Sequence, residues 1–125
     1  MATVEVTDDN FKDVIDNNPI VILDFWATWC GPCKGFAPVF DAASETHTDI
    51  VFGKVDTDQQ QELSGGFNIR SVPTLMVLRD RIMIYREAGA MNAGGFEELI
   101  KQVRELDMDA IRAELAEKEK GEGAA

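Results

Sequence analysis

The hydrophobic positions of this chain form short apolar runs of strand length, separated by segments with helical periodicity. Ile20–Ala27 is apolar at nearly every position, which is typical of a central strand covered on both faces. Ile50–Asp56 is a similar run, and Thr3–Val6 is a short alternating segment. Leu75–Leu78 and Ile82–Tyr85 are so close in sequence that we expect an antiparallel hairpin.

Apolar residues at helical spacing predict helices between these strands. The first follows Thr7-Asp8-Asp9 and stops before Pro19, and the second spans Cys33–Glu45. Gln60–Phe67 is a short helix or turn, and Phe96–Leu106 is an amphipathic helix. The order of elements predicts an α/β domain: a mixed sheet of about five strands, with helices on both faces, parallel crossovers in its first half and the hairpin at its edge. Inside the second helix, Pro38 is expected to cause a kink.

Both cysteines of the chain lie in one hexapeptide, Trp29-Cys30-Gly31-Pro32-Cys33-Lys34. If Cys30 begins a helix, Cys33 lies one turn further on the same face, at a separation of roughly 5 to 6 Å that a disulfide can bridge. Unpaired N–H groups and the helix dipole would stabilise a thiolate on Cys30. Cys30 is therefore the candidate nucleophile, and Cys33 would resolve the mixed disulfide.

A Cys-x-x-Cys pair can also belong to a structural zinc site, or be buried and inert. A structural zinc ion needs about four N or S ligands, whereas this chain has two cysteines and a single histidine, His47. The composition favours redox use and predicts no metal site.

The composition indicates one globular domain in a reducing compartment. The chain has 125 residues, 45% of them hydrophobic, enough for a single core without a disulfide framework. A net charge of −11 opposes binding to nucleic acid or anionic membranes. The segment Met1–Glu5 lacks the features of a signal peptide, and no stretch approaches the roughly 18 apolar residues of a membrane span. A cytoplasmic location is expected.

Asp24 is the one charged residue in the run Ile20–Ala27. Burial would raise the pKa of its carboxyl group and make it a plausible proton acceptor for a thiol. The alternative is an aspartate at the strand end that faces water or caps the next turn. The residues by themselves leave both interpretations open.

The chain resembles the thioredoxin family over roughly residues 3–106. The resemblance rests on three separated motifs, Asp24–Lys34, Arg70–Thr74 and Gly89-Ala90. It implies a thioredoxin fold and a thiol-disulfide oxidoreductase that reduces protein disulfides, with Cys30 as an exposed attacking thiol and Cys33 as the resolving thiol. No cofactor would be bound, and a thioredoxin reductase dependent on flavin and NADPH would restore the dithiol.

The resemblance also implies roles for the other site residues. Asp24 would be buried and exchange a proton with Cys33, and Lys54 would approach that carboxylate. Pro73 would follow a cis peptide bond and face the cysteines, leaving the Val72 backbone free to pair with an extended substrate. The substrate-binding surface would comprise Trp29, Gly31, Pro32, Val72, Thr74, Gly89 and Ala90.

The chain departs from the family pattern in its C-terminal extension, which divides it into a domain of residues 1–106 and an acidic extension of residues 107–125. Asp107 is expected to cap a helix containing Met108, Ile111 and Leu115. Either the chain turns near Asp107 and folds back, or this apolar stripe meets a partner or a second copy. The segment Glu117–Ala125 has no core-forming residues and is expected to fray.

Two further points stay open in the sequence. The hairpin link is Asp80-Arg81, where the family often has a glycine, so the turn type is undetermined.

Rival functions are a disulfide-forming oxidase or isomerase, and a scaffold or chaperone-like module that uses the groove and tail without turnover. The expected partners are disulfide-containing proteins and a reductase, and the expected state is a monomer or a weakly self-associating chain.

Overall fold

The strands form one mixed sheet in the computed structural model, which describes the backbone of residues 2–123 and the side chains of residues 2–119. The sheet has five strands in the order β1-β3-β2-β4-β5. They are β1 (Val4–Glu5), β2 (Ile20–Trp26), β3 (Val51–Asp56), β4 (Thr74–Arg79) and β5 (Ile82–Ala88). β3 is parallel to β1 and β2, whereas β4 is antiparallel to β2 and β5. The predicted combination of parallel crossovers and an antiparallel hairpin is confirmed.

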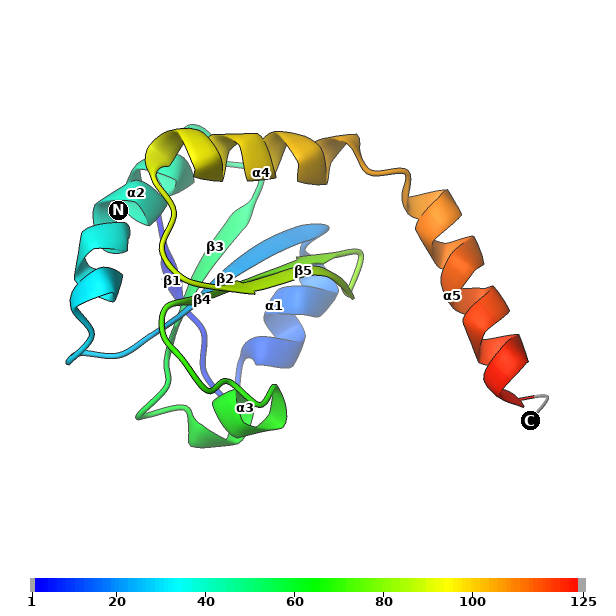
Figure 1. Cartoon of the computed structure of the whole chain (residues 1–125), viewed down its shortest axis with the longest axis horizontal. Helices are drawn as coiled ribbons and strands as arrows, with labels where there is room; N and C mark the ends of the chain where they lie inside the picture. The colour runs from blue at the N-terminus through cyan, green and yellow to red at the C-terminus, as the bar shows by residue number, and fades with distance from the viewer. Residues whose placement is uncertain (1, 124–125) are drawn as a thin grey trace.

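The helices cover both faces of this sheet, as the α/β prediction requires (Figure 1). They are α1 (Phe11–Asn17), α2 (Gly31–Thr46), α3 (Gln61–Gly66) and α4 (Ala93–Glu105), whereas a fifth helix, α5 (Met108–Gly123), lies away from the sheet. One core joins α2 and α4 to Ile20 and Ile22 of β2, and the other joins α1 and α3 to Val21 and Leu23. Because successive strand residues face opposite sides, β2 is buried on both faces, and Asp24 falls on the side of α2.

The hairpin between β4 and β5 is closed by a two-residue turn without glycine. Arg79 pairs with Ile82, and both linking residues have positive φ angles, 52° at Asp80 and 69° at Arg81. This is the pattern of a type I′ turn, whose twist matches that of the flanking strands. The structure therefore settles the turn type that the sequence left open.

The C-terminal extension forms α5, which leaves the body of the molecule where α4 ends (Figure 1). The Asp107 carboxylate accepts a hydrogen bond from the Ala110 N–H at 3.1 Å, so the predicted cap is confirmed. Met108 is only 5% exposed, but Leu115 is 39% exposed. The chain thus turns near Asp107 without folding back along its length. Helix α5 continues through Gly123, although fraying was expected from residue 117, and Ala124 and Ala125 lie outside the described residues.

Arginine side chains fix the junction of α4 and α5 to the hairpin. Arg79 donates to the carbonyls of Val103 at 2.8 Å and Leu106 at 3.0 Å, satisfying acceptors that the end of α4 leaves free. Arg112 of α5 forms an ion pair with Asp80 in the turn, at 3.0 Å. These contacts hold the start of α5, and the division of the chain at residues 106 and 107 stays a prediction.

None of the described helices has the length and apolar character needed to cross a membrane.

Candidate active site

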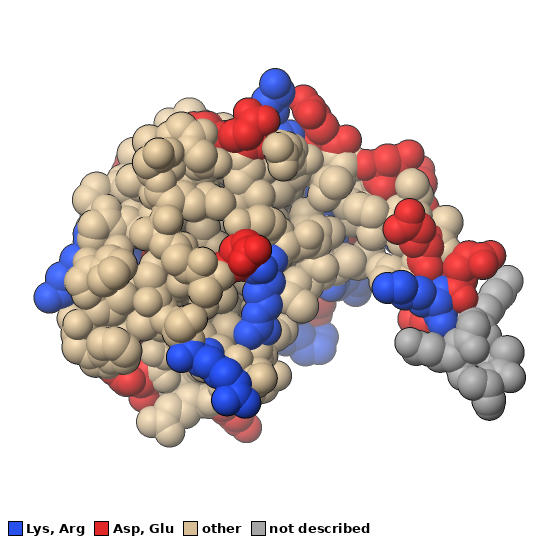
Figure 2. All heavy atoms as spheres, in the orientation of Figure 1, with Lys and Arg blue, Asp and Glu red and all other residues tan. Residues whose placement is uncertain are grey.

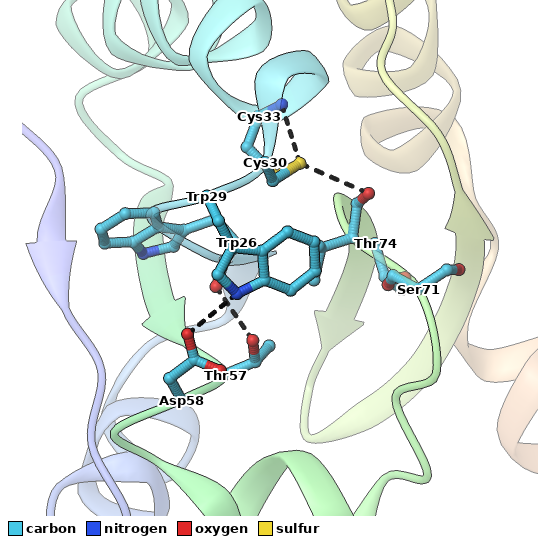
Figure 3. Close-up of a disulfide and its surroundings, with 9 residues drawn as sticks. Trp26, Trp29, Cys30, Cys33, Thr57, Asp58, Ser71 and Thr74 are labelled. Carbon is cyan, nitrogen blue, oxygen red and sulfur yellow. Dashed lines mark hydrogen bonds between the residues drawn. A yellow bond between two sulfur atoms is a disulfide. The ribbon is translucent and has the colours of Figure 1, made fainter.

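The two cysteines lie at the N-terminus of α2, where the sequence predicted them, and they form a disulfide (Figure 3). Cys30 is the N-cap residue, and the Cys33 N–H donates to its Sγ at 3.2 Å. Their Cα atoms are 5.3 Å apart. In the reduced protein the same N–H group and the helix dipole stabilise a thiolate on Cys30. Pro32 in the first turn has no N–H group, so its position removes one of the donors that the start of a helix leaves without a partner.

Cys30 is less accessible than the family resemblance implied. It is 4% exposed, the same fraction as Cys33, so the expectation of an exposed Cys30 is wrong for the disulfide form. The reason is its packing against Val72, whose carbonyl oxygen lies 3.5 Å from Cys30 Sγ. The neighbouring residues Trp29, Gly31 and Pro32 are exposed, so the buried disulfide is flanked by accessible residues.

The loop before β4 lies directly against the disulfide. The Val72–Pro73 peptide bond is cis, as expected. The Pro73 carbonyl accepts a hydrogen bond from the Gly89 N–H at 2.8 Å. This bond joins the motif Gly89-Ala90 to the motif Arg70–Thr74. Gly89 has a φ of 111°, a conformation that favours glycine, and Ala90 beside it is exposed. Three segments far apart in sequence therefore meet at one site.

Thr74 belongs to this loop, but its side chain faces inward. It is 4% exposed, and its hydroxyl donates to the Ser71 carbonyl at 2.7 Å. Thr74 thus holds the loop in shape, and its side chain is not available for the substrate contact that the resemblance implied.

Trp29 forms the exposed rim of the site, with 70% of its surface accessible. Its indole Nε1–H donates to Asp58 at 3.1 Å, and the Thr57 hydroxyl donates to the Trp26 carbonyl at 3.2 Å (Figure 3). Thr57 and Asp58 were not predicted from the sequence as supports of the site. Their position directly after β3 could have indicated this role, because the parallel strands β2 and β3 end at the same edge of the sheet, where the cysteine pair follows β2.

Asp24 is buried beneath this surface. It is 1% exposed, and neither carboxylate oxygen has a hydrogen-bond partner among the described residues. Burial raises the pKa of Asp24 to about 7, a shift that the Lys54 ammonium reduces and the Asp41 carboxylate increases. The interpretation of Asp24 as a solvent-facing or capping residue is therefore wrong. No hydrogen bond joins it to either cysteine in the disulfide form.

Lys54 lies beside Asp24, as the resemblance implied. The two residues are register partners on β2 and β3, and both fall on the face toward α2, because alternate strand residues share a face. The Lys54 Nζ atom is 5.3 Å from the centre of the Trp26 ring, a cation–π distance. Trp26 therefore contacts both this cation and, through the core, the cysteine pair.

The fold and the site define an α/β protein whose activity lies in a paired-cysteine centre at a helix N-terminus. Within the described residues, no group of three or more His, Cys, Asp or Glu side chains could hold a metal ion. The family model described as Thioredoxin matches residues 2–104, and the chain belongs to the thioredoxin family.

Known relatives support the same assignment. The Streptomyces coelicolor protein named "Putative thioredoxin 2" is 46% identical over 118 residues, covering 94% of this chain and 88% of that protein. The "Bifunctional thioredoxin reductase/thioredoxin" of Mycobacterium leprae is 42% identical over 91 residues, 71% of this chain and 20% of that protein. A solved Plasmodium falciparum thioredoxin is 37% identical, with a TM-score of 0.73 over 80% of this chain and 97% of that one.

The chain is therefore a thiol-disulfide oxidoreductase that reduces protein disulfides through Cys30 and Cys33. Scaffolding without turnover is not favoured, since the redox pair and its helix N-terminus are both in place.

Proposed function

We propose that this protein carries electron pairs from a reductase to the disulfides of other proteins, with a separate role for each residue of the site. The observation that carries the proposal is the Cys30–Cys33 disulfide at the start of α2, above a buried and unpaired Asp24. Lys54 tunes that carboxyl group. Substrate contacts fall to the exposed residues Trp29, Gly31, Pro32, Gly89 and Ala90, together with Val72 and Pro73.

Reduction proceeds in two exchange steps. The Cys30 thiolate attacks one sulfur of the substrate disulfide, forming a mixed disulfide and releasing one substrate thiolate. The Cys33 thiol then transfers its proton to the Asp24 carboxylate and attacks Cys30 Sγ. The second substrate thiolate leaves, and the Cys30–Cys33 disulfide forms. Two electrons have passed to the substrate.

The loop before β4 orients the substrate during this exchange. Pro73 cannot donate a hydrogen bond, and the polar backbone groups of Val72 next to it can pair with an extended segment in the manner of strand addition. Trp29 supplies an exposed apolar surface beside the cysteines. Together they hold the substrate sulfur near Cys30.

The dithiol is restored by a thioredoxin reductase that draws its electrons from NADPH through a flavin. The fused reductase and thioredoxin named in Mycobacterium leprae supports this pairing. No cofactor binds the chain itself in this scheme. We place the protein in the cytoplasm, as a monomer or a weakly self-associating chain.

The proposal is tested by the reduction of insulin disulfides with dithiothreitol as electron donor, which makes a specific reductase unnecessary. The full chain should accelerate the reaction, and Cys30→Ser should abolish the acceleration because no nucleophile remains. Cys33→Ser should instead accumulate a mixed disulfide with insulin, visible by mass spectrometry. Absence of acceleration by the folded, reduced protein would contradict the proposal.

A further inference from the structure

A hollow of about 330 Å³ lies beside Trp29, between the disulfide and α3. Its lining contains a single charged residue, Arg70, next to the loop that carries Val72. The side chain of Arg70 is exposed and has no hydrogen bond or ion pair among the described residues. A guanidinium group with five free donors is thus held at the rim of the site.

Ser64 provides a second, independent polar group in this hollow. It lines the hollow and is only 6% exposed. Its Oγ atom is buried and has no hydrogen-bond partner, although buried hydroxyl groups are usually paired. An incoming acceptor atom would give this hydroxyl its missing partner.

The charge near Arg70 contrasts with the charge of the whole chain. On the face drawn in Figure 2, acidic side chains gather over α4 and α5, whereas Lys and Arg side chains predominate in the region between β5 and α3. An adjoining hollow is lined by Arg70, Arg86 and Glu87, and Arg86 already donates to the carbonyls of Phe67 and Asn68. Among the described residues that line these two hollows, Arg70 is therefore the cation without a hydrogen bond or ion pair.

We propose that Arg70 and Ser64 form a specificity subsite for an acidic side chain of the substrate, located a few residues from the cysteine that Cys30 attacks. This inference rests on the proposed function and names its preferred substrate class. A carboxylate can accept hydrogen bonds from both the guanidinium and the hydroxyl group. A net charge of −11 would by itself repel acidic segments, so a preference for them has to arise locally.

The test uses the reduced protein and three sets of disulfide-bonded peptides, identical except for Glu, Gln or Lys at positions within three residues of the cysteine. Single-turnover reduction is followed by tryptophan fluorescence. At its best position, the Glu peptide should react about fivefold faster than the Gln peptide, the size of effect that a partly exposed ion pair supports. Arg70→Gln should remove this preference, and Arg70→Glu should reverse it in favour of the Lys peptide.

Two further variants separate the subsite from general electrostatics. Lys101→Gln removes one positive charge from an exposed position of α4, and it should keep the preference for Glu. Ser64→Ala should reduce the preference for Glu over Gln about twofold, since one of the two hydrogen bonds to the carboxylate is lost.

The outcomes distinguish this inference from the proposed function. Failure of the wild-type protein to reduce the Gln peptide would contradict the proposed function. Normal reduction of that peptide, with no Glu preference or with a preference that survives Arg70→Gln, would overturn the subsite.

Discussion

Asp24 illustrates at the scale of a single residue how a functional group can reduce the stability of the fold. Its carboxyl group lies in the core without a hydrogen-bond partner. Between the ordinary pKa of an aspartate, about 3.9, and the folded-state pKa of about 7, the folded protein keeps a proton that the unfolded chain has lost. Stability therefore falls as the pH rises through this window and levels off above it.

We predict that Asp24→Asn raises the free energy of unfolding of the disulfide form by about 4 kcal/mol more at pH 8 than at pH 4. The wild-type protein needs to bury a charge at the higher pH, whereas the amide stays neutral at both. Urea unfolding at the two pH values measures the difference. Asp9→Asn, at an exposed position, should show no comparable gain, and equal effects of Asp24→Asn at both pH values would contradict the prediction.

Single residues also show where the sequence argument was sufficient. Cys30, Cys33 and Asp24 could be found because their residue types are unusual for their positions: two cysteines one turn apart, and one carboxylate in an apolar strand. Ser64 has no unusual residue type for its position. It comes to line one hollow with Arg70 only because α3 and the loop before β4 meet beside Trp29.

At the scale of the element, the hairpin between β4 and β5 contains a correctable strain. Arg81 adopts a φ of 69°, in the left-handed region that costs a residue with a Cβ atom about 1 kcal/mol or more. Glycine adopts this conformation readily and is preferred in type I′ turns.

We therefore predict that Arg81→Gly stabilises the protein by about 1 kcal/mol, which corresponds to a rise of roughly 3 °C in Tm. Arg81→Ala is the matched control, because it removes the same side chain and keeps the Cβ atom. Thermal unfolding of both variants provides the measurement. A gain shared by the alanine variant would show that the side chain, and not the turn conformation, is responsible.

Element boundaries followed from the sequence to different degrees. The strands and helices that carry strong apolar periodicity lie where predicted, because burial of one face or of both dictates that periodicity. The turn type did not follow, because Asp80-Arg81 lacks the glycine that usually marks it. Only the register of β4 on β5 forces these two residues into the left-handed region.

At the scale of the whole molecule, α5 is attached through few contacts. Met108 is buried and Arg112 pairs with Asp80, but the rest of the described helix is largely exposed. Among the described residues, no hydrogen bond joins α5 to the disulfide or to the loop before β4. The hydrogen bonds of these two segments involve α2, β4 and the segment that carries Gly89.

We predict that deletion after Leu106 leaves insulin reduction within about twofold of the full chain and lowers the free energy of unfolding by about 2 kcal/mol, the value of burying one methionine side chain. Met108→Ala in the full chain should reproduce most of the stability loss. Activity assays and urea unfolding of the two variants provide the test. A large loss of activity in the folded truncated protein would refute the prediction and give α5 a direct part in catalysis.

The sequence by itself determined the α/β class and the redox pair, and it marked Asp24 as a candidate proton acceptor while leaving its burial open. Local chemistry and apolar periodicity encode these features within single segments. Only the tertiary structure decided how accessible Cys30 is, that Thr74 faces inward, how far α5 leaves the body, and which polar groups share the hollow beside Trp29. Each of these properties depends on contacts between segments distant in sequence, and no pattern within one segment contains them.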